Sequence, residues 1–285
     1  MTNTNAVPTD PYPNRSETPP VVVDGVPDSC LVCTVRGDWA HFRRIDRTVT
    51  KQTYRLPPRT TVAGLLAAIV GVGRDDYYEV FDPAVSAVGV EVVGDLRTTT
   101  QPSLGLGTNP GETFDSVGKT RGNGISVEFP DSTDNRQIHS YEYVVDPAYR
   151  LYVAVEDADF HAALKHHLER GTSYYPPSLG LSELLARVET PESGVEREVT
   201  ASVPGESTVE VDSAIPAAVE TVVPSPGTPH HVERLPAAME ADGRNRRTTE
   251  FVDYAFAAGD ADESLASTGE GLALGEVDGR TIAFY

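Results

Sequence analysis

The chain has 285 residues, and its 43 Asp and Glu residues against 23 Lys and Arg residues give a formal net charge of −20. This length predicts roughly two domains. Hydrophobic residues make up 39% of the chain, but no apolar run approaches the roughly 20 residues that a membrane helix needs. The N-terminal residues also lack the basic start and the apolar segment of a secretory signal. We therefore expect a cytoplasmic protein without membrane contacts.

Arginine greatly outnumbers lysine, because only three of the 23 basic residues are lysines, at positions 51, 119 and 165. An excess of acidic residues with almost no lysine is typical of a cytosolic protein adapted to high salt, where such a surface stays hydrated. The alternative is a protein that repels nucleic acid altogether. The local concentration of positive charge described below argues against that alternative.

The N-terminal residues 1–22, rich in Pro, Thr and Asn, predict a disordered arm. Residues 30–36 then form an apolar, β-branched run that predicts a buried strand. Cys30 and Cys33 in this run are a C-x-x-C pattern, which is found in redox sites and in half of a zinc site. Residues three apart on a strand point to opposite faces, and no second Cys pair follows. We therefore expect buried structural cysteines and no bound metal.

Positive charge is concentrated in residues 36–73, which hold seven of the 23 basic residues and only two carboxylates. Trp39, Phe42 and Tyr54 lie among these cations. Cations mixed with aromatic rings suit single-stranded nucleic acid, which offers both phosphates and flat bases. The alternative is an Arg-rich loop that pairs with the acidic surface of the same protein.

The second half of this stretch predicts a helix. Pro57 and Pro58 end an extended run, and Thr60 or Thr61 can cap the helix N-terminus. Small residues line a second face, so both faces are expected to be covered, and Gly71 and Gly73 supply a C-terminal stop. The positive end of the helix favours a phosphate nearby. The apolar stripe at i, i+3, i+4, i+7 and i+8 consists of Val62, Leu65, Leu66, Ile69 and Val70.

A second strand is predicted at residues 84–93, and a long segment rich in Gly, Thr and Asn follows. Within it, residues 125–129 and 138–145 predict a hairpin on an insertion that spans residues 95–146. The segment comes near a phosphate-binding P-loop, but Thr113 stands where that pattern requires glycine. We therefore expect no nucleotide cofactor and none of any other kind.

A second strand–helix pair follows, with a strand at residues 150–156 and a helix capped by Asp157. Repetition of strand and helix suggests an α+β, ferredoxin-like domain over residues 23–190. Short alternating runs predict a smaller, mainly β domain over residues 191–285. Within that domain, Arg244, Arg246 and Arg247 form a weak candidate anion site, with a solvated strand entrance as the alternative.

Residues 37–71 resemble the N-terminal signature of the fifth CRISPR-associated (Cas) family, which belongs to the RAMP superfamily of RNA-binding proteins. A weaker match continues at residues 175–180, Tyr-Pro-Pro-Ser-Leu-Gly. The matching residues of the first segment are Gly37, Ala40, Phe42, Arg43, Thr53, Tyr54, Pro57, Pro58, Thr60, Thr61, Gly64, Leu65, Leu66, Ala68, Ile69 and Gly71.

The resemblance implies a RAMP, ferredoxin-like (RRM-like) fold in which the insertion forms a β-hairpin thumb. It also implies a subunit of a type I-B interference complex, Cascade, which defends against viruses and plasmids. Such a subunit binds the 5′ handle of the CRISPR RNA (crRNA). The implied partners are therefore this handle, the backbone and large subunits of the complex and, indirectly, target DNA.

One branch of the resembled family cuts the CRISPR repeat RNA, so a metal-independent endoribonuclease is the alternative. That branch pairs a tyrosine matching Tyr54 with an adjacent Lys–His in the insertion. Here Lys119 is followed by Thr120, and the trio is incomplete. His41 and Lys51 lie close to Tyr54 in sequence and could supply a base and a positive group. We expect a non-cleaving role, with a general single-strand-binding module as a third reading.

The handle site is expected to combine arginine–phosphate contacts with aromatic stacking. At about 1 M salt the Debye length is roughly 3 Å, so a few close contacts should dominate over long-range attraction. We expect Arg43, Arg44 and one or more of the three aromatic residues to supply them, with core packing as the alternative for the aromatics. The full set of candidates is Arg36, Trp39, His41, Phe42, Arg43, Arg44, Arg47, Lys51, Tyr54 and Arg55, together with Lys119 and Arg121 from the insertion.

Overall fold

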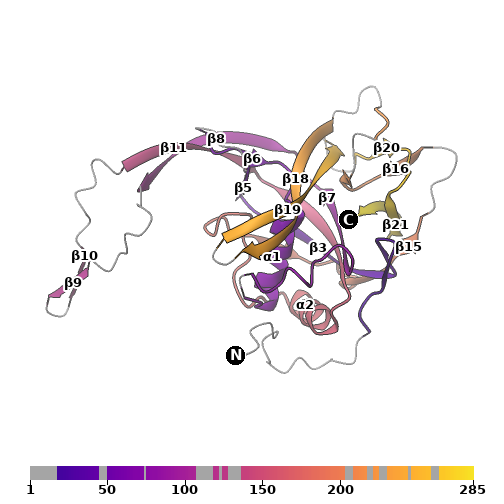
Figure 1. Cartoon of the computed structure of the whole chain (residues 1–285), viewed down its shortest axis with the longest axis horizontal. Coiled ribbons are helices and arrows are strands. Elements are labelled where there is room, and N and C mark those ends of the chain that lie inside the picture. Colours follow the sequence, from indigo (N-terminus) through magenta and orange to yellow (C-terminus); the bar gives the residue numbers. More distant parts are fainter. Residues whose placement is uncertain are drawn as a thin grey trace.

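The computed structural model describes residues 18–44, 50–73, 75–106, 118–121, 124–127, 136–202, 208–216, 221–224, 230–242, 245–257 and 263–285. Within residues 104–137 and 242–245 it describes backbone only. Most of the predicted N-terminal arm therefore lies outside the described residues. The chain is mostly β (Figure 1).

A central antiparallel sheet has the strand order β13-β3-β12-β7, and a further strand, β14, also pairs with β3. Its middle strands are nearly continuous runs of buried residues, as expected for a sheet covered on both faces. The predicted strands at residues 30–36, 84–93 and 150–156 are confirmed as β3, β7 and β12. The bounds are β3 Ser29–Arg36, β7 Ser86–Val92, β12 Ala148–Val155, β13 Arg187–Glu189 and β14 Glu196–Glu198.

Two helices contribute to the core on one face of this sheet, α1 (Arg59–Val70) after β3 and α2 (Ala158–Arg170) after β12. The predicted cap of α2 is confirmed, because the Asp157 carboxylate accepts a hydrogen bond from the Phe160 N–H at 2.8 Å. The predicted threonine cap of α1 is wrong. Pro58 is the N-cap, and α1 has no side-chain cap. The fixed φ of proline presets the helical entry instead.

The opposite face of the sheet is covered by the hairpin of β21 (Ala273–Val277) and β22 (Arg280–Phe284). Gly89 permits the close approach, because a Cβ there would lie 2.4 Å from Cγ2 of Ile282. Cys30 belongs to the core on this face, and Cys33 to the core on the helical face. Burial raises the pKa of each thiol to about 12. The expected assignment as buried structural cysteines is therefore confirmed.

A long two-stranded ribbon leaves the body beside the central sheet, formed by β8 (Arg97–Leu106) and β11 (Arg136–Val145) (Figure 1). The pairing expected from sequence is wrong, because β11 pairs with β8 and with β4 (Trp39–Ala40). The threonines of β8 favour a strand. Pro102 is tolerated because β8 is the last strand of this sheet among the described residues. A separate short hairpin pairs β9 (Gly118–Arg121) with β10 (Gly124–Val127).

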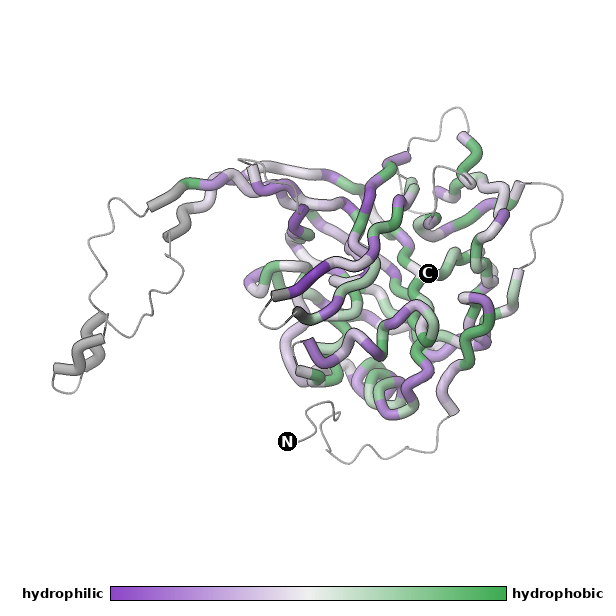
Figure 2. The backbone as a smooth tube through the Cα atoms, in the orientation of Figure 1, coloured by the Kyte–Doolittle hydropathy of each residue, from purple (hydrophilic) through white to green (hydrophobic). Residues whose placement is uncertain are grey.

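The strands β18 (His230–Asp242) and β19 (Asn245–Ala257) pair in a second ribbon, which packs on α1. Leu235, Tyr254 and Phe256 from this ribbon share one core cluster with the apolar stripe of α1. Both faces of α1 are therefore covered, as expected. Figure 2 shows the hydrophobic residues gathered in the body of the molecule, with few of them along the β8–β11 ribbon.

The remaining strands are short and antiparallel. β1 pairs with β2, β5 with β6, β15 with β21, β16 with β20, and β17 with β19. Their bounds are β1 Val22–Val23, β2 Val26–Pro27, β5 Phe42–Arg43, β6 Thr53–Tyr54, β15 Thr200–Ala201, β16 Val209–Val211, β17 Ile215–Pro216 and β20 Leu265–Ser267. Neither described helix is long and apolar enough to cross a membrane.

Candidate nucleic-acid interface

Two of the aromatic residues expected to stack on bases are core residues instead. Phe42 is 2% exposed and Tyr54 is 4% exposed, and the two face each other across the pairing of β5 with β6. The Phe42 ring packs 5.9 Å from that of Tyr149, which is also buried. Neither ring is available to an unpaired base. For these two residues the alternative of core packing is correct, because the β5–β6 pairing directs them inward.

Three of the arginines in residues 36–73 are committed to contacts within the protein. Arg55 donates to the buried carboxylate of Glu233 from its backbone N–H at 2.9 Å and from Nη1 at 3.0 Å. Arg36 forms a more exposed pair with Glu189 at 2.9 Å. Arg59 is buried and donates to the carbonyls of Tyr285 and Phe81 and to the Ser86 hydroxyl. These three side chains stabilise the fold, so Arg55 and Arg36 are weaker candidates for phosphate contacts.

The positive charge on the surface of this stretch comes from Arg43, Arg44 and Lys51. Arg43 is exposed at the end of β5. The guanidinium of Arg44 lies 5.2 Å from the centroid of the Tyr54 ring, so the ring holds it by a cation–π contact. The Lys51 backbone bridges to β11, donating to the carbonyl of Ser140 at 2.7 Å and accepting from the Glu142 N–H at 2.9 Å. The Lys51 contacts place this cation beside β11, and Arg43 lies near it because its strand partner Thr53 donates its N–H to the Glu142 carboxylate at 3.2 Å.

An aromatic cluster lies at the same place, and two of its members were missed from the sequence. Tyr141 and Tyr143 alternate on β11, with ring centroids 6.2 Å apart. Trp39 meets Tyr143 edge-on at 5.3 Å, and the His41 ring lies 5.2 Å from Tyr141 and 5.8 Å from Tyr143. The signal in the sequence was the Tyr-x-Tyr alternation, which puts both rings on one face of a strand.

His41 is buried beneath this cluster and neutral. Its Nδ1 lies 2.7 Å from the carbonyl oxygen of Glu142, so the proton is assigned to Nδ1. Burial lowers the pKa of His41, against a smaller opposing effect of this hydrogen bond. Nε2 has no hydrogen-bond partner among the described groups. A buried ring of this kind orients its aromatic neighbours and is poorly placed to contact a phosphate.

The two stretches that resembled one family in sequence meet at His41. The His41 N–H donates to the carbonyl of Leu179 at 3.0 Å. Gly180 has a φ of +98°, and a Cβ there would lie 2.0 Å from the His41 carbonyl oxygen. A glycine is therefore required where residues 175–180 cross the end of β4.

Three other candidates cannot be placed at this surface. Arg47 lies outside the described residues. Lys119 and Arg121 are on β9, of which only the backbone is described. Their expected role as thumb contacts therefore stays a prediction.

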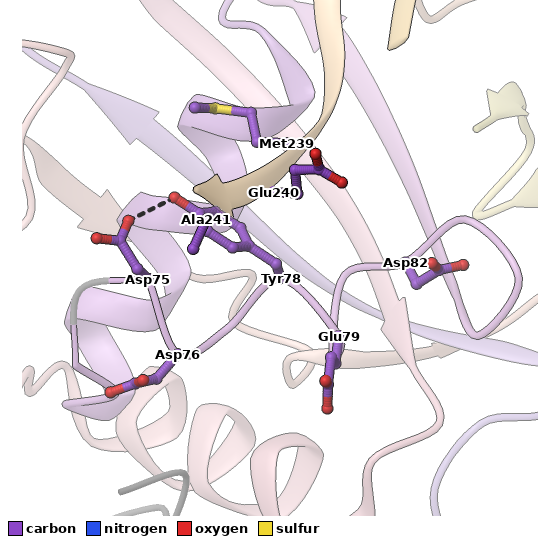
Figure 3. Close-up of a pocket in the computed structure, with 8 residues that line it drawn as sticks. All are labelled: Asp75, Asp76, Tyr78, Glu79, Asp82, Met239, Glu240 and Ala241. Carbon is purple, nitrogen blue, oxygen red and sulfur yellow. Dashed lines mark hydrogen bonds between the residues drawn. The ribbon is translucent and has the colours of Figure 1, made fainter. Parts of the chain in front are cut away.

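A cleft between the loop that follows α1 and the end of β18 is acidic and unsuited to phosphate. It has a volume of about 320 Å³ and is lined by Asp75, Asp76, Tyr78, Glu79, Asp82, Met239, Glu240 and Ala241 (Figure 3). A neighbouring cleft of about 200 Å³ includes the first turn of α1 together with Asp82 and Glu240. The expectation of a phosphate at the N-terminus of α1 is therefore not supported, because the cleft beside its first turn contains Asp82 and Glu240, and the Arg59 guanidinium is used by groups of the protein.

The arginines near the start of β19 belong to this acidic region. Arg246 donates to Asp75 at 2.5 Å, and Arg247 pairs with Glu240. Tyr78 also donates to Asp75, at 2.6 Å (Figure 3). Because these cations are neutralised by the protein itself, the weak anion site suggested at Arg246 and Arg247 is not supported. Arg244 lies outside the described residues.

The surface around Arg43, Lys51 and the aromatic cluster lies within the part of the chain that matches a known family. The family model described as CRISPR-associated protein (Cas_Cas5) matches residues 30–251. The chain belongs to the Cas5 family. The match spans the basic stretch, the β8–β11 ribbon and residues 175–180, so every candidate site residue of this Cas5-family chain lies inside it.

Solved structures give more distant likenesses. A chain titled "CRISPR RNA-guided surveillance complex" has 16% sequence identity and a TM-score of 0.49, covering 82% of this chain and 91% of its own. A chain from "Cryo-EM structure of the Type III-B Cmr-beta bound to cognate target RNA and AMPPnP, state 1" has 11% identity and a TM-score of 0.42, covering 84% and 86%. No curated protein matches the chain. The family assignment therefore rests on the matched family model.

Proposed function

We propose that this Cas5-family chain is a non-catalytic subunit of a type I CRISPR interference complex, of type I-B, that binds and caps the 5′ handle of crRNA. The observation that carries the proposal is the convergence of surface cations and half-buried aromatic rings at the base of the β8–β11 ribbon, inside the region matched by the family model. Phosphates and unpaired bases are the ligand groups that such a surface suits.

We extend the proposal to the whole molecule. The central sheet with α1 and α2 is a RAMP, ferredoxin-like domain, supported by its antiparallel β13-β3-β12-β7 order. Its partners are the backbone subunit, the large subunit and, indirectly, target DNA, in the cytoplasm of a cell with high internal salt. The acidic composition supports the proposed high internal salt. The β8–β11 ribbon serves as the thumb.

The face of the central sheet opposite α1 and α2 is not the RNA site in this proposal. In RRM domains the exposed sheet face carries aromatic residues that stack on bases. Here Ile282 and Phe284 of β22 are buried against that face. The proposal instead uses the surface around Arg43, Lys51 and Tyr143, where cations and half-buried aromatic rings lie together.

A non-catalytic role is favoured by the position of Tyr54. A general base must reach the 2′-hydroxyl whose proton it removes. The Tyr54 side chain is 4% exposed and packed in the core. Incubation of the purified chain with CRISPR repeat RNA tests this point. We expect no cleavage, and one defined cut abolished by Tyr54→Phe would assign the endoribonuclease activity instead.

The binding surface is tested by retention of guide RNA in molar salt. Arg43→Ala, Arg44→Ala and Trp39→Ala are expected to lose RNA, because close contacts survive screening while long-range attraction does not. Arg234→Ala is the matched control, since this exposed arginine stacks on Phe251 at 5.7 Å in the second ribbon. If all three variants fold and retain RNA as the parent does, this surface is not the handle site.

A further inference from the structure

The pairing of the β4-β11-β8 sheet gathers one set of side chains on one face. Tyr141 and Tyr143 share a face because they alternate on β11. Residues paired across neighbouring strands also share a face, so Gln101, opposite Tyr141, and Thr99, opposite Tyr143, lie on it as well. Lys51 joins them because it forms an isolated bridge with Tyr141. We call this set the aromatic face: Trp39, Lys51, Thr99, Gln101, Tyr141 and Tyr143.

The aromatic rings of this face do not serve the core. Trp39, Tyr141 and Tyr143 are half-buried, and none belongs to a described core cluster. Phe42 and Tyr54 belong instead to the largest of the described core clusters. Three large rings held together at a surface cover one another only in part, which leaves aromatic area available to a flat ligand.

The charge of the aromatic face contrasts with the rest of the chain. Lys51 supplies a cation, whereas Arg97, opposite Val145 at the end of the ribbon, pairs with Asp146 at 3.4 Å. Glu142 alternates to the other face, where its carboxylate accepts a hydrogen bond from the Thr53 N–H at 3.2 Å. Glu183 is the acidic side chain whose charge acts on Tyr143. A surface without acids at its paired positions is unusual in a chain of net charge −20.

The buried His41 ring supports the rings of Tyr141 and Tyr143. Its Nδ1–H is held by the Glu142 carbonyl at 2.7 Å, and its ring contacts both tyrosines. Burial and the charge of Glu183 raise the pKa of the Tyr143 hydroxyl, so that hydroxyl keeps its proton and can donate. Preorganised rings lose little conformational entropy when a ligand binds.

From this arrangement we propose that the aromatic face stacks unpaired bases of a single-stranded RNA, with Tyr141 and Tyr143 as the stacking rings and Lys51 contacting an adjacent phosphate. The inference rests on the proposed function and names the residues that contact the bases. It transfers the stacking role from the buried Phe42 and Tyr54 to two tyrosines of β11. His41 is a positioning residue for them.

The test uses the full chain and a fluorescent single-stranded RNA of the sequence that copurifies with the parent protein. Tyr143→Leu should weaken binding roughly 5- to 150-fold, the range for loss of one stacked base, while Tyr143→Phe should bind nearly as the parent does. Tyr175→Leu is the matched control, because Tyr175 is 50% exposed and lies outside the aromatic face.

Salt dependence separates stacking from phosphate contact. Tyr143→Leu should lower affinity by the same factor at every salt concentration. Lys51→Ala should instead reduce the slope of log affinity against log salt by about 0.7, the value for one phosphate of a single strand. A Tyr143→Leu effect that vanished in high salt would overturn the stacking role.

A second arm leaves the protein unmodified and removes single bases from the RNA. An abasic position that contacts Tyr143 should weaken the parent as much as Tyr143→Leu does, and the two changes together should cost no more than either alone. If the parent binds RNA but abasic positions and Tyr143→Leu both behave as Tyr175→Leu does, the aromatic face is not the base site, and the proposed function stands. If the parent holds no RNA, the proposed function itself fails.

Discussion

The imidazole of His41 donates from Nδ1 to the backbone carbonyl of Glu142, 2.7 Å away, and so joins residues 101 positions apart in the chain. This contact ties the basic stretch to β11. The same hydrogen bond holds the His41 ring in contact with Tyr141 and Tyr143. The base of the β8–β11 ribbon is therefore built around a buried, neutral histidine.

We predict that acidification destabilises this region through His41. Burial lowers its pKa below the ordinary value of 6.5, which the unfolded chain retains. The neutral ring's contribution is therefore complete above pH 6.5 and is lost as pH falls toward the folded pKa. The charged groups that act on His41 are Glu142, Glu183 and Arg43.

Thermal unfolding of the parent and of His41→Asn between pH 5 and 8 measures this effect. The asparagine amide can still donate to the Glu142 carbonyl but does not titrate in this range. The stability advantage of the parent should shrink as pH falls below 6.5. An advantage that stays constant or grows on acidification would contradict a lowered pKa.

Gly180→Ala should destabilise the protein by more than a strained φ alone, which costs of order 1–3 kcal/mol. The added Cβ would lie 2.0 Å from the His41 carbonyl oxygen, a backbone atom that cannot move aside cheaply. Gly171→Ala is the matched control, because Gly171 also has a positive φ but nothing lies within 4 Å of its Cβ position. Urea unfolding should rank the two clearly, and equal losses would show that residues 175–180 do not cross β4 so closely.

Arg55→Ala should destabilise the fold by about 1–3 kcal/mol, since it leaves the Glu233 carboxylate without its cation. Glu233 is 5% exposed, and Arg55 is partly exposed, which limits the loss. Arg36→Ala removes a pair that is exposed on both sides and should cost less than about 1 kcal/mol. If chemical unfolding shows Arg55→Ala to be neutral while RNA affinity falls, Arg55 belongs to the binding surface and not to the fold.

Local patterns in the sequence predicted the central elements well. Residues 30–36, the stripe from Val62 to Val70 and the Asp157 cap each carry their signal within one strand or helix, and each is confirmed. The β8–β11 pairing could not be predicted in the same way. It is set by cross-strand register along the whole ribbon, which no local pattern within β8 or β11 carries.

The candidate site was only partly predictable for a related reason. Composition located the cations and aromatics together, but it does not say which ring points inward. Phe42 and Tyr54 point inward because β5 pairs with β6, and Arg55 is neutralised by Glu233, 178 residues away. Tyr141 and Tyr143 join the site through the long-range pairing of β11 with β4.

The central claim is that this chain holds the 5′ handle of crRNA, and the most direct measurement is sequencing of the RNA that copurifies with the tagged chain in molar salt. We predict short RNAs whose 5′ ends all begin with the same repeat-derived handle, together with other subunits of the complex. RNA with random ends, or no RNA from a protein that is folded, would contradict the account.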